Sequence, residues 1–330
     1  MTSATILGLS GLTLTETERA FFREAQPWGF ILFARNIDTP DQVLRLTSDL
    51  REAVGRDAPV LIDQEGGRVQ RMRAPHWREW LPPLEQAAFL DPERSFWLRA
   101  RIMADELRAV GVDSNCAPCC DIAGPQTHPF LRNRCMGEDA ATVARNARAS
   151  AMGFLAGGVL PVIKHIPGHG RATADSHKDL PLVEACAEDL IAQDFAAFQP
   201  LHDMPMAMTA HIRFAAFDDA PATQSPVMVD LIRQVIGFDG LLMSDDLSMQ
   251  ALSGSIRQRA EATMAAGCDI TLHCNGERAE MEEAVVGAGT LSDAAKTRAA
   301  AAIARRAMPE AVDIAVLERE LADLLQASGV

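Results

Sequence analysis

The chain has 330 residues, of which 48% are hydrophobic and 23% charged, an ordinary globular composition with ample apolar material for a large core. A net charge of −14 without a long basic run argues against nucleic acid or an anionic membrane as a main partner, and no stretch is apolar and long enough to span a bilayer. The first residues lack the basic and apolar regions of a signal peptide, and the seven cysteines are an odd number, so we expect a cytoplasmic protein with reduced thiols.

Short apolar runs alternate along the chain with helical patterns. The runs are continuous rather than alternating, which is typical of parallel strands buried on both faces. Strands are predicted at residues 6–9, 29–33, 59–63, 112–117, 159–165, 206–211, 240–245 and 269–272. Helices are predicted at residues 15–25, from 39, and at 92–110, 139–156, 185–198, 226–236 and 256–266. This pattern predicts an α/β fold, a (β/α)₈ TIM-type barrel that spans residues 1–330 as a single domain, with extra C-terminal helices after about residue 289.

Polar residues stand at the C-terminal ends of several predicted strands. They are Asp63, Lys164, His165, His211 and Asp245. Each one alone could be a helix cap or a satisfied core residue. In a (β/α)₈ barrel, however, this edge forms the active-site face, and residues from four strands meet there once the strands close. The sequence therefore predicts an active site built from these side chains.

The stretch from Pro161 to Asp179 begins as a strand and becomes a Pro/Gly loop with three His, two Lys, one Arg and two Asp. Within it, Asp175 and His177 lie two residues apart. A carboxylate that accepts from one imidazole nitrogen orients the ring, and the other nitrogen can then donate and remove a proton. The alternative for this pair is an Asx-turn beside a surface histidine. Because little apolar surface is available to pin residues 169–178, we expect this loop to be less rigid than the barrel strands.

Asp245 is the candidate for nucleophilic chemistry. It ends a strand after four apolar or small residues, so its carboxylate is expected to point into the barrel mouth. A carboxylate there suits nucleophilic attack or stabilisation of a cation. Strand alternation turns Asp246 the other way, where it could cap the next helix.

Five sequence blocks within roughly residues 4–275 closely resemble the single-domain β-N-acetylglucosaminidases of glycoside hydrolase family 3. The blocks are Asp63-Gln-Glu-Gly-Gly-Arg-Val, Lys164-His-Ile-Pro-Gly-His-Gly, Thr173-Ala-Asp-Ser-His, Met208-Thr-Ala-His and Ser244-Asp-Asp-Leu-Ser-Met. The resemblance implies removal of non-reducing terminal β-linked N-acetylglucosamine, typically from 1,6-anhydro-N-acetylmuramic acid with a stem peptide, in cytoplasmic peptidoglycan recycling. It also implies retention of anomeric configuration.

The same resemblance implies a role for each site residue. Asp245 is expected to form a covalent glycosyl-enzyme, His177 to be the general acid/base and Asp175 to be its dyad partner. The positions implied to bind substrate are Asp63, Arg71, Arg134, Lys164, His165 and His211. Neither a metal nor another cofactor is expected, and the partner is a small sugar bound by a monomer. A buried carboxylate at Asp63 is costly unless it is paired, so we expect Arg71 or Lys164 beside it.

Two features of the composition affect the reading of the site. Cys116-Ala-Pro-Cys119-Cys120 stands where the family usually has apolar residues before Asp121; a CxxC pair could bind metal or cycle redox, but without a second pair we expect packing thiols. The chain contains no Tyr, so any stacking on sugar must use Trp, Phe or His.

Three other functions remain open from the sequence. A phosphorylase could use the same scaffold, because a histidine acid/base would repel incoming phosphate less than a carboxylate does. A metal-dependent barrel hydrolase could gather His165, His169, His177, His211 and Asp175 as ligands. A barrel that binds sugar without turnover is the third, and an intact Asp245, Asp175 and His177 argue against it.

Overall fold

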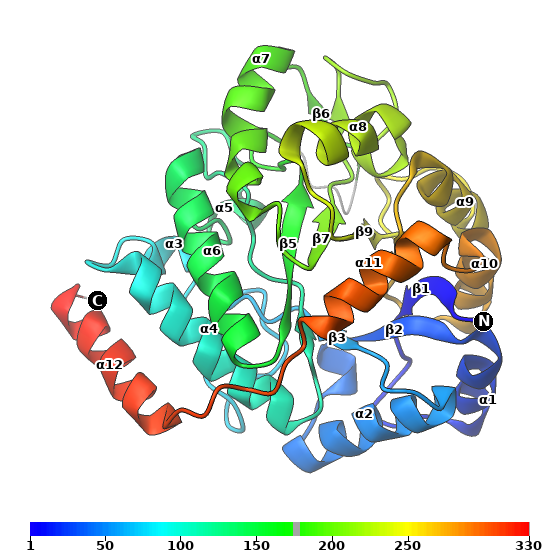
Figure 1. Cartoon of the computed structure of the whole chain (residues 1–330), viewed down its shortest axis with the longest axis horizontal. Coiled ribbons are helices and arrows are strands. Elements are labelled where there is room, and N and C mark those ends of the chain that lie inside the picture. Colours follow the sequence, from blue (N-terminus) through cyan, green and yellow to red (C-terminus); the bar gives the residue numbers. More distant parts are fainter. Residues whose placement is uncertain (174–178, 330) are drawn as a thin grey trace.

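The computed structural model describes residues 1–173 and 179–329, and its main feature is a closed barrel of parallel strands (Figure 1). The strands are β1 (Ser3–Leu7), β2 (Pro27–Leu32), β3 (Val60–Ile62), β4 (Ser114–Asn115), β5 (Leu160–Ile166), β7 (Met206–Thr209), β9 (Leu241–Asp246) and β10 (Ile270–His273). Their order around the barrel is β1-β10-β9-β7-β5-β4-β3-β2, and β1 closes the ring by pairing with both β10 and β2. The predicted (β/α)₈ barrel is confirmed, with each predicted strand in its place.

Helices surround the barrel (Figure 1). The longer ones are α1 (Glu16–Ala25), α2 (Pro40–Val54), α4 (Pro92–Ala109), α6 (Ala140–Ala156), α9 (Ile256–Ala266), α10 (Arg278–Ala288), α11 (Asp293–Ala304) and α12 (Ile314–Ala327). Their start sites follow from local chemistry, since the Thr15 and Thr39 side chains accept from the backbone amides of Glu18 and Gln42. Within residues 1–173 and 179–329, no helix is long and apolar enough to cross a bilayer.

Several short elements were not predicted. A separate two-stranded parallel sheet pairs β6 (Leu182–Val183) with β8 (Arg213–Phe214), and two residues per strand are too few for a pattern to show. The loops before α4 and α6 contain α3 (Pro83–Gln86) and α5 (Pro129–Arg132). The predicted helix at 185–198 is broken into α7 (Ala187–Asp189), a π-turn and 3₁₀ turns, and α8 (Pro226–Leu231) likewise runs into a π-turn.

Strand alternation carries side chains from the barrel core to its mouth. One buried cluster contains residues from around the ring, including Ile31, Leu61, Val162, Met243 and Leu272. The residue two positions further along each of these strands has its side chain on the same face. Those residues are Phe33, Asp63, Lys164, Asp245 and Cys274, and all of them line a single pocket at the C-terminal end of the barrel.

Candidate active site

The pocket at the barrel mouth has a cavity of about 240 Å³. Six residues that the sequence predicts for the site line it, namely Asp63, Arg71, Arg134, Lys164, His165 and Asp245. Apolar contact comes from Phe33, Phe130, Met208 and Met249. A pocket with a few converging polar groups and an apolar wall is typical of a small-molecule site.

A row of alternating charges lies at the pocket floor, where four of its members line the cavity and the buried Glu65, which does not line it, joins two of them. Arg71 Nη2 lies 3.0 Å from Asp63 Oδ2, and Lys164 Nζ lies 2.8 Å from Asp63 Oδ1. The same Nζ lies 2.7 Å from Glu65 Oε1. Arg134 completes the row with two hydrogen bonds to the Glu65 carboxylate, of 2.9 and 2.8 Å. The expected basic partner of Asp63 is confirmed, and it is two residues rather than one.

These ion pairs keep the buried groups of the floor charged. Burial alone would raise the pKa of Glu65, but Arg134 and Lys164 outweigh it and bring that pKa to about 2. Lys164 and Arg71 lower the pKa of Asp63 in the same way, although burial would raise it. The carboxylates of Asp63 and Glu65 in turn raise the pKa of Lys164 despite its burial. The floor therefore offers fixed donors and acceptors to sugar hydroxyls. Glu65 was not among the residues predicted for the site, although its place two residues after Asp63 could have suggested it.

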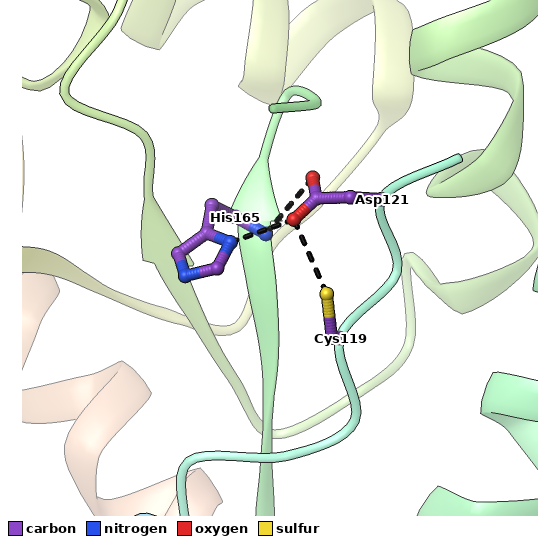
Figure 2. Close-up of side chains that lie close together, drawn as sticks. All are labelled: Cys119, Asp121 and His165. Carbon is purple, nitrogen blue, oxygen red and sulfur yellow. Dashed lines mark hydrogen bonds and ion pairs between the residues drawn. The ribbon is translucent and has the colours of Figure 1, made fainter. Parts of the chain in front are cut away.

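Asp121 and His165 form an acid–histidine pair (Figure 2), and Nε2 of His165 lies 3.5 Å from Nη2 of Arg134 in the row of charges. His165 Nδ1 is 2.7 Å from Oδ2 of Asp121, a residue with a fully buried side chain that the sequence analysis did not assign to the site. The other Asp121 oxygen accepts from the backbone amide of His169 at 2.6 Å. Asp121 thus connects the loop after β4 with the end of β5 and orients the imidazole of His165.

Asp245 differs from the paired carboxylates of the floor. Its Oδ1 accepts the backbone amide of Asp246 at 2.8 Å, and among the described residues the carboxylate has no ion pair. Burial would raise its pKa, but His211, His165, the Asp246 amide and Lys164 lower it on balance. Asp245 is therefore an ionised carboxylate whose second oxygen is available to a ligand.

Asp246 and His211 occupy different places from those predicted. Asp246 also lines the pocket, and its carboxylate accepts hydrogen bonds from the backbone amides of Ser248 and Cys274. The next helix, α9, is capped by Ser255, so the expected capping role of Asp246 is wrong. His211 is fully buried behind the pocket, with Nδ1 2.7 Å from Thr223 Oγ1 and Nε2 3.0 Å from the Asp246 carbonyl. Since both ring nitrogens are engaged, His211 supports the end of β9 in this structure rather than facing the cavity.

The predicted acid/base pair, Asp175 and His177, lies outside the described residues. The segment that leads to it is well packed. His169, Gly170 and Ala172 are buried, and a side chain at position 170 would clash with the Ile122 carbonyl, since its Cβ would lie 2.3 Å from that oxygen. The expectation of little anchoring surface is therefore wrong for residues 169–172, because the loop after β4 covers them.

The cysteines are free thiols, and six of the seven are buried, as expected for packing residues. Within the part of the chain that is described, Cys119, Asp121 and His165 are the one group of three metal-ligand side chains close enough to hold an ion. Their side chains are already hydrogen-bonded to one another (Figure 2). The Cys119 thiol lies 3.3 Å from Asp121 Oδ2, and His165 Nδ1 lies 2.7 Å from the same oxygen. The five-residue ligand set considered from the sequence is not formed by its described members, because His211 is held by Thr223 and Asp246.

The buried His169 predicts how stability depends on pH. Burial and the neighbouring His165 lower the pKa of His169 to about 4. Between pH 6.5 and 4 the unfolded chain therefore binds a proton that the folded chain does not, so stability falls as pH falls through this window. We expect the His169→Gln variant to lose roughly 3 kcal/mol less than the wild type over that range. Denaturant unfolding at several pH values measures this, with the exposed His202→Gln as the matched control; equal slopes would contradict the prediction.

Sequence and structure comparisons agree with this geometry. Residues 6–306 match the glycosyl hydrolase family 3 N-terminal domain. A beta-hexosaminidase from Methylococcus capsulatus is 38% identical over 280 residues, which cover 81% of this chain and 81% of that protein. A beta-hexosaminidase from Bordetella avium is 36% identical over 281 residues, which cover 82% and 80%.

Solved structures with the same architecture include NagZ from Neisseria gonorrhoeae, which has a TM-score of 0.83 and 28% identity over 99% of this chain and 96% of that one. The same enzyme in complex with N-trifluoroacetyl-D-glucosamine gives a TM-score of 0.83 at 27% identity, with the same coverage. A family 3 β-N-acetylglucosaminidase from Paenibacillus sp. has a TM-score of 0.87 and 29% identity, over 97% of this chain and 67% of that one. With a family match over most of its length and relatives matched over most of theirs, this chain belongs to glycosyl hydrolase family 3.

Proposed function

We propose that this protein is a retaining β-N-acetylglucosaminidase that acts on peptidoglycan fragments. Its substrate is N-acetylglucosamine β-linked to 1,6-anhydro-N-acetylmuramic acid, with or without a peptide. The single observation that carries the proposal is the contrast between two carboxylates in one pocket. Asp63 is held by Lys164 and Arg71, whereas Asp245 is ionised and bonded on one oxygen by a backbone amide.

That contrast separates binding from chemistry. A carboxylate held by two cations is a poor nucleophile but a good acceptor for sugar hydroxyls, and Lys164, Arg71 and Arg134 supply donors around it. Asp245 projects into the same cavity from strand β9, on the opposite side of the ring from β3 and Asp63, where it can reach the anomeric carbon of a sugar bound on that floor. The relative from Neisseria gonorrhoeae that holds N-trifluoroacetyl-D-glucosamine supports an N-acylated glucosamine as the sugar.

The proposed reaction has two displacements. Asp245 attacks the anomeric carbon and forms a glycosyl ester, while His177, oriented by Asp175, gives a proton to the departing oxygen. Water then attacks the same carbon, loses its proton to His177 and releases Asp245. Each step inverts the configuration, so the product retains that of the substrate. No step requires a metal or an organic cofactor.

A chromogenic aryl N-acetyl-β-glucosaminide tests the proposal directly. We expect release of the aryl group, with the β-anomer of the free sugar as first product by NMR. Adding inorganic phosphate should leave N-acetylglucosamine as the product; accumulation of the sugar 1-phosphate would show a phosphorylase instead. Loss of activity with a chelator, together with a stoichiometric bound transition metal, would favour a metal-dependent hydrolase. Absence of turnover with retained sugar binding would show a non-catalytic barrel.

The His177→Ala variant is expected to discriminate between leaving groups. Loss of a general acid costs about 10²–10⁴-fold where the leaving oxygen needs protonation, and much less for an activated aryl group. We therefore expect kcat/KM to fall far more for the disaccharide fragment than for the aryl glycoside. Asp175→Ala should show a weaker form of the same defect. An equal loss on both substrates would remove His177 from the acid role.

The proposed location and oligomeric state of the enzyme follow from its resemblance to the single-domain β-N-acetylglucosaminidases of family 3. We propose a monomer in the cytoplasm whose single catalytic domain is the barrel, and whose partner is the small sugar fragment.

A further inference from the structure

The three residues of Figure 2 form a buried row that ends at the pocket. The Cys119 thiol lies 3.3 Å from Oδ2 of Asp121, and the same oxygen lies 2.7 Å from His165 Nδ1. The other oxygen of Asp121 accepts from the amides of His169 at 2.6 Å and His165 at 3.4 Å. All four contacts bring a donor to the carboxylate, so both of its oxygens are used inside the protein.

The neighbours of His165 determine which ring nitrogen carries the proton. An ionised carboxylate can only accept, so the short contact to Asp121 requires a hydrogen on Nδ1. On the opposite side, Nε2 lies 3.5 Å from Arg134 Nη2. A guanidinium can only donate, so this neighbour favours a lone pair on Nε2. The two contacts agree on one tautomer of the neutral ring, with the proton on Nδ1.

This tautomer adds a second hydrogen-bond acceptor to a floor whose lining is mostly donors. Lys164, Arg71 and Arg134 are donors, and the acceptor Asp63 is shared between two of them. A sugar hydroxyl both donates and accepts, so a floor of donors needs further acceptors to satisfy several hydroxyls at once. His165 and Arg134 both line the cavity, and the contact between Nε2 and Arg134 Nη2, at 3.5 Å, is long enough for a hydroxyl to replace it.

We propose that Asp121 is a positioning residue that fixes the Nδ1-protonated tautomer of His165, making Nε2 an acceptor for one sugar hydroxyl, and that Cys119 steadies Asp121 from behind. The proposal rests on the proposed function for the identity of the sugar. The assignment of the tautomer does not depend on it.

Cys119 has a role in this row that an aliphatic residue of similar size lacks. It packs in a small buried cluster with Ala123, Leu131 and Cys135, where shape alone would accept an apolar side chain. Its thiol, however, is a hydrogen-bond donor directed at Asp121, whereas the Cys135 thiol faces the Leu131 carbonyl at 3.6 Å. The two cysteines share an environment and contact each other, but the Cys119 thiol donates to Asp121 whereas the Cys135 thiol donates to a backbone carbonyl.

The first test measures the tautomer and needs no turnover. In ¹⁵N-labelled full-length protein, long-range proton–nitrogen correlations distinguish the two ring nitrogens, and the His165→Gln variant identifies the signals. We expect Nδ1–H in the wild type. In Asp121→Asn the amide can donate, so the proton should move to Nε2. An Nε2–H tautomer in the wild type, or an unchanged tautomer in Asp121→Asn, would overturn the proposal. If Asp121→Asn fails to fold, the wild-type assignment alone decides.

The second test asks whether the tautomer matters to the sugar. Asp121→Asn is expected to lower kcat/KM roughly 10- to 100-fold, the range known for carboxylates that orient metal-bound imidazoles, with most of the change in KM. A set of N-acetylglucosaminides that each lack one hydroxyl then identifies the group that Nε2 contacts. For the substrate without the hydroxyl that donates to Nε2, wild type and Asp121→Asn should have similar kcat/KM, because neither can make that hydrogen bond. An equal loss on every deoxy substrate would show a merely structural role for Asp121.

Cys119 and Cys135 give a matched pair of variants that tests the hydrogen bond from Cys119 to Asp121. Cys119→Ala should lower kcat/KM about 2- to 5-fold, the size expected for loss of one weak hydrogen bond, and Cys119→Ser should restore part of it. Cys135→Ala removes a thiol from the same cluster and should leave KM and the His165 signals unchanged. Equal effects of the two alanine variants would reduce Cys119 to packing. Should the wild type hydrolyse no N-acetylglucosaminide, the proposed function fails while the tautomer assignment is still decided by NMR.

Discussion

Replacing Asp245 with Asn or Ala is expected to lower turnover by at least about 10³-fold while the protein remains folded. The carboxylate ends strand β9, projects into the cavity and has no ion pair among the described residues, so its removal breaks no salt bridge there. The loss therefore falls on the chemical step rather than on the fold. Activity on an aryl N-acetylglucosaminide and the thermal midpoint of each variant measure the two effects separately.

Asp246 is the natural control for this experiment, because it is adjacent, acidic and part of the same pocket. A fluorinated slow substrate should label Asp245 and leave Asp246 unmodified, which peptide mass spectrometry can resolve. Asp246→Asn should weaken the loop contacts to Ser248 and Cys274 but keep covalent labelling at Asp245. Substantial turnover in either Asp245 variant, or a label on Asp246, would exclude Asp245 as the nucleophile.

Lys164→Met is expected to lower the free energy of unfolding by about 3–5 kcal/mol at neutral pH and to abolish sugar binding. Lys164 Nζ stands between Asp63 and Glu65, at 2.8 and 2.7 Å, and its side chain is 3% exposed. Without it, two buried carboxylates face each other with one arginine each. Unfolding in denaturant measures the loss, and isothermal titration with N-acetylglucosamine measures the binding.

The pH dependence of this deficit separates charge from packing. The lowered carboxylate pKa values give stability that is present above pH 4.5 and is lost as pH falls towards the folded pKa of Glu65, about 2. The difference in the free energy of unfolding between wild type and Lys164→Met should therefore become smaller as the pH falls. Lys296→Met, at an exposed lysine paired with Asp293, should change stability by less than about 0.5 kcal/mol. A deficit independent of pH would show that Lys164 acts mainly through packing.

The barrel could be predicted because its strands are continuous apolar runs that end in polar residues. The positions of Asp63, Lys164 and Asp245 at the ends of predicted strands placed them at the active-site edge of the barrel, and the two-residue repeat directed Asp245 into its mouth. It could not place Lys164 and His165 in one pocket, since consecutive residues of a regular strand face opposite sides. The pairing of β5 with β7 shifts register between Lys164 and Ile166, and the side chains of Lys164 and His165 both line the cavity.

Other parts of the site depend on contacts between distant segments. His211 was expected at the pocket because it follows a strand, but its partner Thr223 lies 12 residues later in the chain, and no local pattern specifies that contact. Asp121 follows three cysteines in a stretch without helical or strand periodicity, so nothing in the sequence around it indicated that it would meet His165, 44 residues away. Glu65, by contrast, is an acidic residue two positions after Asp63 in the same loop, and this proximity could have suggested it.

The difference in ion pairing between the two pocket carboxylates, Asp63 and Asp245, bears on the design of inhibitors. A sugar analogue with a protonated nitrogen at the anomeric position would place its cation beside Asp245, whose second oxygen can receive it. The same cation placed over Asp63 would have to compete with Lys164 and Arg71, which already hold both oxygens. A basic iminosugar should therefore gain affinity when its nitrogen is at the anomeric position, beside Asp245. It should lose affinity when the nitrogen is at the positions that contact Asp63.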